Sequence, residues 1–117
     1  MNAERQAQLA HALELILREL ISQYHPEKVI LFGSMADGRV ERWSDLDLVI
    51  IKETAKPFLQ RLKEVALLCG ASVGVDFLVY QPSEFDQMIA EENPFILQEV
   101  VRKGKVLYER QPAKAVA

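Results

Sequence analysis

Three short apolar runs, at residues 28–32, 45–51 and 72–80, constrain the fold of this chain most strongly. Each is bounded by Gly, Pro or charged residues, which is typical of strands in a compact sheet. A fourth and shorter run, at 106–108, predicts a last strand. All four runs are far shorter than the roughly 18 apolar residues that a membrane-spanning helix needs.

Helical periodicity fills the segments between these strands. The expected helices cover about residues 3–24, Pro57 to Gly70, a short segment from Pro82, and Asn93 to about Lys103. The order α-β-β-α-β-α-α-β predicts an α/β (α+β) fold, a mixed sheet with helices packed mainly on one face. Because no repeat or linker divides the chain, we expect one domain over residues 1–110 and a disordered tail over 111–117.

Composition excludes several classes of function. The 117 residues are 50% hydrophobic and 26% charged, which is typical of a soluble globular domain. A net charge of -3 argues against direct nucleic-acid binding, which needs a basic surface. The single cysteine, Cys69, excludes an internal disulfide and a thiolate-rich zinc site. No signal-peptide pattern follows the first residues, so we expect a cytoplasmic protein without membrane association.

Three aspartates in the strands are the candidate metal ligands. Asp45 and Asp47 are two residues apart, so their side chains point to the same face of a strand. Asp76 lies inside the third apolar run, with Gly74 on the same face. If the two strands pair, three carboxylates converge, and such ligands suit Mg²⁺ or Mn²⁺ in a two-metal site for nucleotidyl transfer. The alternatives are a solvated strand start for the first pair and an edge strand whose Asp76 reaches water.

The turn formed by Gly33 and Ser34 is a candidate phosphate site. It directly follows the first strand, where a glycine lets a phosphate approach the backbone closely. The amides of a following helical turn and the Ser34 hydroxyl would supply donors. The Walker motif is absent, so this turn gains significance only together with the aspartates.

The combined pattern is Gly33-Ser34, ten residues, Asp45-x-Asp47, an apolar strand and a further strand aspartate, Asp76. It resembles the nucleotidyltransferase superfamily that includes DNA polymerase beta. It is most similar to the minimal nucleotidyltransferases (MNT), small proteins often encoded beside a HEPN-domain partner. The matching segments are residues 29–34, 43–50, 75–79 and, more softly, 95–108, so the resemblance covers nearly the whole chain.

The resemblance implies a role for each of these residues. Asp45 and Asp47 would bind Mg²⁺ (or Mn²⁺), and Asp76 would bind one of the two ions and accept the proton of the attacking hydroxyl. Gly33 and Ser34 would hold the triphosphate of ATP, the substrate. The implied fold is the nucleotidyltransferase fold.

One position departs from the family pattern. Many relatives carry Arg or Lys where this chain has Asp37. Arg39 and Arg42 follow shortly after and would supply the missing positive charge; the alternative is that both belong to a solvated loop. We expect Trp43 to pack this loop against the domain, with stacking on a nucleotide base as the alternative.

Larger relatives hold their acceptor with a second domain, whereas 41 residues (117 minus 76) follow Asp76 here. The resemblance therefore implies a protein acceptor: a HEPN-domain toxin that receives AMP on a tyrosine. This chain would be the antitoxin, a protein adenylyltransferase in a hetero-oligomer with its partner. Two alternatives stay open: an antitoxin of weak or no activity that neutralises its partner by binding alone, or a subunit of a small-molecule nucleotidyltransferase.

Overall fold

The computed structural model describes residues 2–111, and the expected tail over 111–117 therefore lies almost entirely outside the described residues. The elements are, in order, α1 (Ala3–Glu19), η1 (Leu20–Tyr24), β1 (Lys28–Phe32), α2 (Ser34–Asp37), β2 (Leu46–Ile51), α3 (Phe58–Cys69), β3 (Val75–Tyr80), α4 (Pro82–Ala90), η2 (Ile96–Arg102) and β4 (Lys105–Glu109). The two η elements are π-helical, and η1 continues α1 without a break. All four expected strands are present.

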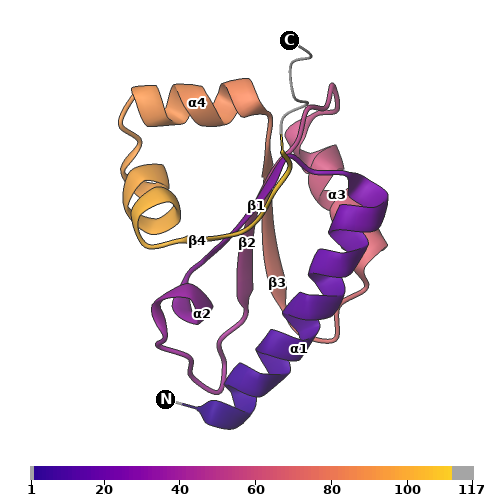
Figure 1. Ribbon diagram of the computed structural model, residues 1–117, viewed down its shortest axis with the longest axis vertical. Helices are drawn as coiled ribbons and strands as arrows, with labels where there is room; N and C mark the ends of the chain where they lie inside the picture. The colour runs from indigo at the N-terminus through magenta and orange to yellow at the C-terminus, as the bar shows by residue number, and fades with distance from the viewer. Residues whose placement is uncertain (1, 112–117) are drawn as a thin grey trace.

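The four strands form one mixed sheet in the order β3-β2-β1-β4. β1 is antiparallel to both β2 and β4, and β2 is parallel to β3. A parallel pair needs a crossover connection, and α3 supplies it between β2 and β3 (Figure 1). The predicted mixed α/β fold is confirmed.

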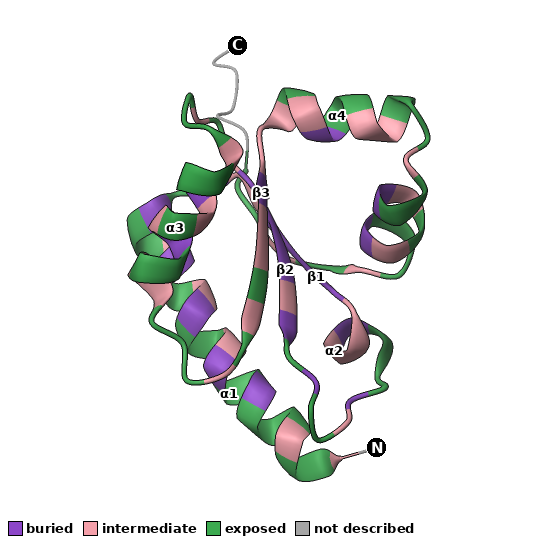
Figure 2. Cartoon of the chain, turned by 180° about the vertical axis from the view of Figure 1, so that it is seen from behind, coloured by how far each residue is buried: buried purple, intermediate pink, exposed green. Residues whose placement is uncertain are grey.

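Helices lie on both sides of this sheet (Figure 1). Alternate residues of β1 and β2, such as Leu31 and Leu48, pack with α1 and α3 in the larger core cluster. The intervening residues, such as Ile30 and Val49, pack with Phe85 of α4 and Ile96 of η2 in a smaller one. The two longest helices therefore share one face, as expected, and the structure adds a second, partial layer on the other. β1 and β2 are mostly buried for this reason (Figure 2).

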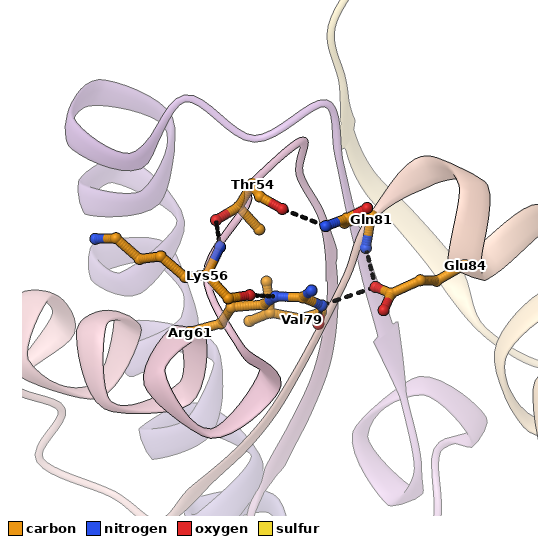
Figure 3. Close-up of polar contacts among 6 residues, drawn as sticks. All are labelled: Thr54, Lys56, Arg61, Val79, Gln81 and Glu84. Atoms are coloured by element: carbon orange, nitrogen blue, oxygen red, sulfur yellow. Dashed lines mark hydrogen bonds and ion pairs between the residues drawn. The ribbon is translucent and has the colours of Figure 1, made fainter.

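A buried arginine connects α3 to the segment that precedes it, to β3 and to α4. Arg61 is 5% exposed and lies on α3. Its Nε donates to the carbonyl oxygen of Lys56 at 2.7 Å, and its Nη1 donates to the carbonyl oxygen of Val79 at 3.1 Å. The same Nη1 is 2.7 Å from Oε1 of Glu84 (Figure 3). The guanidinium is therefore satisfied mainly by backbone carbonyls and one carboxylate.

Glu84 also forms the N-terminal cap of α4. Its Oε1 accepts a hydrogen bond from the backbone N–H of Gln81 at 2.7 Å, and the Gln81 side chain donates to the carbonyl oxygen of Thr54 (Figure 3). Gln81, the N-cap residue, and Glu84 form a capping box, which satisfies N–H groups that a helix start leaves without intrahelical acceptors. One carboxylate thus fixes both the entry of α4 and the arginine of α3.

Replacement of Arg61 by alanine is expected to lower the free energy of unfolding by about 3 kcal/mol. It leaves the buried carbonyl oxygen of Val79 without its donor, removes the cation that pairs with Glu84 and leaves a cavity. Urea denaturation measures this change. Arg18→Ala removes an exposed arginine whose Glu14 partner is 4.0 Å away, and we expect a change below about 0.5 kcal/mol. Equal effects of the two substitutions would contradict this account of Arg61.

Glu84→Gln is expected to destabilise the protein at neutral pH but not at acidic pH. The Arg61 guanidinium and the Gln81 N–H hold the pKa of Glu84 below its usual range. A lowered pKa adds stability above the usual pKa of the carboxyl, and this stability is lost as the pH falls through the lowered value. Urea unfolding of both proteins at several pH values between neutral and about pH 3 should show the difference shrink with acidity. A gap that stays constant with pH would contradict it.

Candidate functional site

Parallel pairing of β2 and β3 places two of the candidate carboxylates next to each other. Asp47 of β2 is the register partner of Asp76 of β3, so both side chains lie on the same face of the sheet. Phe32, at the end of β1, is the register partner of Asp47 on the other side. Asp45 directly precedes β2, whose first residue is Leu46. The two acidic strands thus pair, which was the condition for their carboxylates to meet. Asp76 is nevertheless exposed on β3, at the edge of the sheet, as the alternative for this residue had it.

Asp47 is the carboxyl group most strongly affected by this arrangement. Burial, the nearby charge of Asp76, a side-chain hydrogen bond with Asp76 and the charge of Asp45 together raise the pKa of Asp47 to about 6. Desolvation and like charges both disfavour an ionised carboxylate, so the group is held at an energetic cost. The three aspartates therefore act on one another electrostatically at one end of β2 and β3.

Two glycines leave space for these carboxylates. A Cβ on Gly33 would overlap the Asp47 carboxylate, and the φ of +75° at Gly33 is one that other residues rarely adopt. A Cβ on Gly74 would lie 2.7 Å from Cγ of Asp45. The sequence indicated an open face beside Gly74, and the structure shows that the carboxylate of Asp45 fills it. Gly33 thus packs directly against a candidate ligand.

The turn after Gly33 is the short helix α2, so a helical turn follows the glycine as expected. The carbonyl oxygen of Gly33 accepts from the N–H groups of Ala36 and Asp37 at 3.0 and 3.1 Å. Ser34 and Met35 begin the helix, where N–H groups have no intrahelical acceptor. These two amides and the Ser34 hydroxyl form the donor set available beside Asp47.

Among residues 2–111, neither candidate arginine forms a hydrogen bond or ion pair with the three candidate metal ligands. The Nη2 atom of Arg39 is 3.0 Å from Oδ2 of Asp37, and this hydrogen bond lowers the pKa of Asp37. The charge of Arg39 is therefore offset by the residue whose negative charge it was expected to compensate. Arg42 lines a small hollow with the first turns of α1, including Glu4 and Arg5.

Arg5 is a site residue that sequence reasoning missed. Its Nη2 is 3.3 Å from Oδ1 of Asp45, and its Nε donates to the carbonyl oxygen of Ser44 at 2.8 Å. Forty residues separate Arg5 from Asp45, so no local pattern connects them. The one available signal is position: a cation in the first turn of a helix is electrostatically unfavourable unless a partner offsets it.

Trp43 does not pack the loop against the domain, so that expectation is wrong. Its side chain is 74% exposed, whereas the neighbouring Ser44 is buried and accepts the backbone N–H of Glu41 on its hydroxyl at 2.8 Å. The short hydroxyl residue, rather than the aromatic one, anchors the loop. Trp43 stands in solvent two residues before Asp45.

The model of the family described as "Polymerase beta, Nucleotidyltransferase" matches residues 14–113. The chain belongs to this nucleotidyltransferase family. No curated protein matches it significantly. A crystal structure of a Sulfolobus solfataricus protein assigned as a nucleotidyltransferase is similar over 92% of this chain and 86% of that chain, with 22% identity and a TM-score of 0.66. A crystal structure of a toxin–antitoxin with AMP-PNP contains a chain with 21% identity and a TM-score of 0.50, over 86% of this chain and 73% of that chain.

These likenesses confirm the nucleotidyltransferase fold for the chain. Members of the family generally use a nucleotide substrate and divalent metal ions. In the part of the chain that the structure describes, no helix is long and apolar enough to cross a membrane.

The donor set of this nucleotidyltransferase fits hard divalent cations. Carboxylate oxygens are the only candidate ligands, and such ligands suit Mg²⁺ or Mn²⁺. Among residues 2–111, no three His, Cys, Asp or Glu side chains are arranged to hold a metal ion. The expected convergence of all three aspartates into one ligand set is therefore not seen among these residues, and Asp45 contacts Arg5 instead.

Proposed function

We propose that this chain is a nucleotidyltransferase that uses Mg²⁺ or Mn²⁺ to transfer AMP from ATP to a hydroxyl group. The observation that carries the proposal is the placement of Asp47 in register with Asp76 and against Gly33. This placement brings a carboxylate pair close to the turn at Gly33 and Ser34, whose amides we propose as phosphate donors. Family membership supports the reaction type.

Each residue has a defined task in the proposed reaction. Asp45, Asp47 and Asp76 would hold two divalent ions, whose positive charge would stabilise the attacking and leaving oxygens. Gly33 and Ser34 bind the triphosphate through backbone amides and the hydroxyl, and Arg39 and Arg42 add positive charge near the loop.

The proposed reaction forms one bond and breaks another at the same phosphorus atom. The acceptor oxygen forms a bond to the α-phosphorus of ATP, and the bond from that phosphorus to the bridging oxygen breaks. Pyrophosphate leaves, and the proton of the acceptor hydroxyl goes to the carboxylate of Asp76. The hydroxyl must be held in line with the leaving oxygen, which makes positioning of the acceptor a large part of catalysis.

We further propose that the acceptor is a tyrosine of a HEPN-type toxin and that the chain is its antitoxin. The motivation is the fold shared with a chain of a toxin–antitoxin structure that contains AMP-PNP. AMP on a tyrosine adds negative charge, which would repel RNA phosphates at the surface of the partner. The two proteins would form a hetero-oligomer.

Intact-mass spectrometry of the partner after incubation with ATP, Mg²⁺ and this chain tests the proposal. The expected result is an added AMP on the partner with the wild-type chain and with Asp86→Asn, a matched change at an exposed aspartate of α4. Asp47→Asn should add none. An unmodified partner whose activity is fully neutralised would contradict AMP transfer.

The second candidate function, neutralisation by binding alone, is favoured by one observation. Arg39 is paired with Asp37, so the loop offers less net positive charge to a triphosphate than an unpaired arginine would. Under this alternative, Asp47→Asn would neutralise the partner as fully as the wild-type chain. The activity of the partner, measured beside its mass, therefore separates the two candidates.

A further inference from the structure

Arg5 connects the first turn of α1 to the loop that precedes the acidic strand. Its side chain is 19% exposed, although it lies near the start of the chain. Besides its 2.8 Å bond to the carbonyl oxygen of Ser44, it approaches Asp45 at 3.3 Å and Oε1 of Gln8 at 3.3 Å. The backbone N–H of Asn2 also donates to the carbonyl oxygen of Val40 at 2.9 Å. The guanidinium is thus held in place on three sides.

The position of Arg5 places a fixed positive charge on one oxygen of a candidate metal ligand. Oδ1 of Asp45 faces the guanidinium, while the same carboxylate lies over Gly74. Asp45 is 49% exposed, so the pair is open to solvent and is not locked by burial. A cation that binds at this carboxylate must share it with Arg5 or displace Arg5.

We infer that Arg5 is a positioning residue that acts as an internal counter-cation at Asp45 and weakens metal binding there. The inference rests on the proposed function, because it assigns Asp45 to the metal site. Arg5 neutralises Asp45 before a metal ion binds, so that the 38–45 loop holds its shape beside three carboxylates. The ion then competes with the guanidinium for Asp45.

A counter-cation and a structural anchor predict opposite effects of removing Arg5. If Arg5 competes with the metal ion, loss of its charge strengthens the attraction between the ion and Asp45. If Arg5 only anchors the loop, its loss leaves the ligand less well placed and weakens metal binding. The sign of the change in metal affinity therefore decides between the two roles.

Mn²⁺ binding to the full chain, measured by the electron paramagnetic resonance of free Mn²⁺, tests the inference without any activity assay. We expect Arg5→Gln to bind Mn²⁺ roughly ten-fold more tightly than the wild type at low salt, with a smaller gain at high salt. Arg5→Lys keeps the charge and should stay close to the wild type. Arg18→Gln removes the same charge from an exposed position of α1 and should change nothing.

Thermal melting provides a second readout. Arg5→Gln should melt at a lower temperature than the wild type without metal, and Mn²⁺ should raise its melting temperature by more than it raises that of the wild type. Equal or weaker Mn²⁺ binding by Arg5→Gln, with the wild type binding normally, would overturn the inference alone. A wild-type chain that binds no Mn²⁺ even with AMP-PNP would overturn the inference together with the proposed metal site.

Discussion

Asp47→Asn is expected to lower AMP transfer on the order of a thousand-fold while making the folded protein more stable. In the proposed site the carboxylate would supply a charge that the metal ions require, and an amide of the same shape would supply none. The same charge is unfavourable to folding, because burial and the charges of Asp76 and Asp45 raise the pKa of Asp47 to about 6. A carboxyl whose pKa is raised in the folded state is ionised at neutral pH at the expense of stability.

Label transfer from ATP and thermal melting without metal measure the two effects. Asp86→Asn, on the exposed side of α4, should leave both unchanged. A variant that loses activity and also melts at a lower temperature would indicate that Asp47 supports the fold rather than the chemistry.

Gly33→Ala is expected to abolish activity and to lower the free energy of unfolding by about 2 kcal/mol or more. The φ of +75° and ψ of -158° at Gly33 strain any other residue, and the new Cβ would overlap the Asp47 carboxylate. The substitution therefore acts on the fold and displaces a candidate ligand at once. Urea denaturation and label transfer measure the two consequences.

Gly38→Ala is the matched control for Gly33→Ala. Gly38 also has a positive φ, +82°, but a Cβ there meets nothing within 4 Å. It should cost only the backbone strain, about 1 kcal/mol, and leave most of the activity. Equal losses of activity in the two variants would show that close packing against Asp47 is not what makes Gly33 necessary.

The strands and the acidic pair could be predicted from the sequence because local pattern determines them. The four apolar runs carry their own turn signals. The sequence left open whether Asp76 belongs to a polar site or to an edge strand in water, and in the structure it is exposed on the edge strand β3. Strand ends were less predictable: Asp45 and residues 72–74 lie outside β2 and β3, since pairing rather than composition fixes where a strand begins. The bounds of the short helix α2 were not predictable, because four residues are too few to show a helical period.

The features that depend on distant contacts could not be predicted. Arg5 reaches Asp45 across forty residues, and nothing near either residue specifies the pair. The layer formed by α4 and η2 lies on the second face of the sheet because Ile30 and Val49 offer an apolar surface there. Since the central strands are apolar on both faces, their sequence does not show which helices cover which face. The exposed Trp43 shows the same limit, since it is the adjacent Ser44 that is buried and hydrogen-bonded to Glu41.

Transfer of label from ATP to the partner tests the central claim most directly. The chain, its partner and Mg²⁺ are incubated in parallel with ATP labelled at the α-phosphate or at the γ-phosphate, and the label on the partner is counted. Nucleotidyl transfer predicts label on the partner only from the α-phosphate, release of the γ-label as pyrophosphate, and loss of both with Asp47→Asn. Label from the γ-phosphate on the partner, or α-label that persists with Asp47→Asn, would contradict the account.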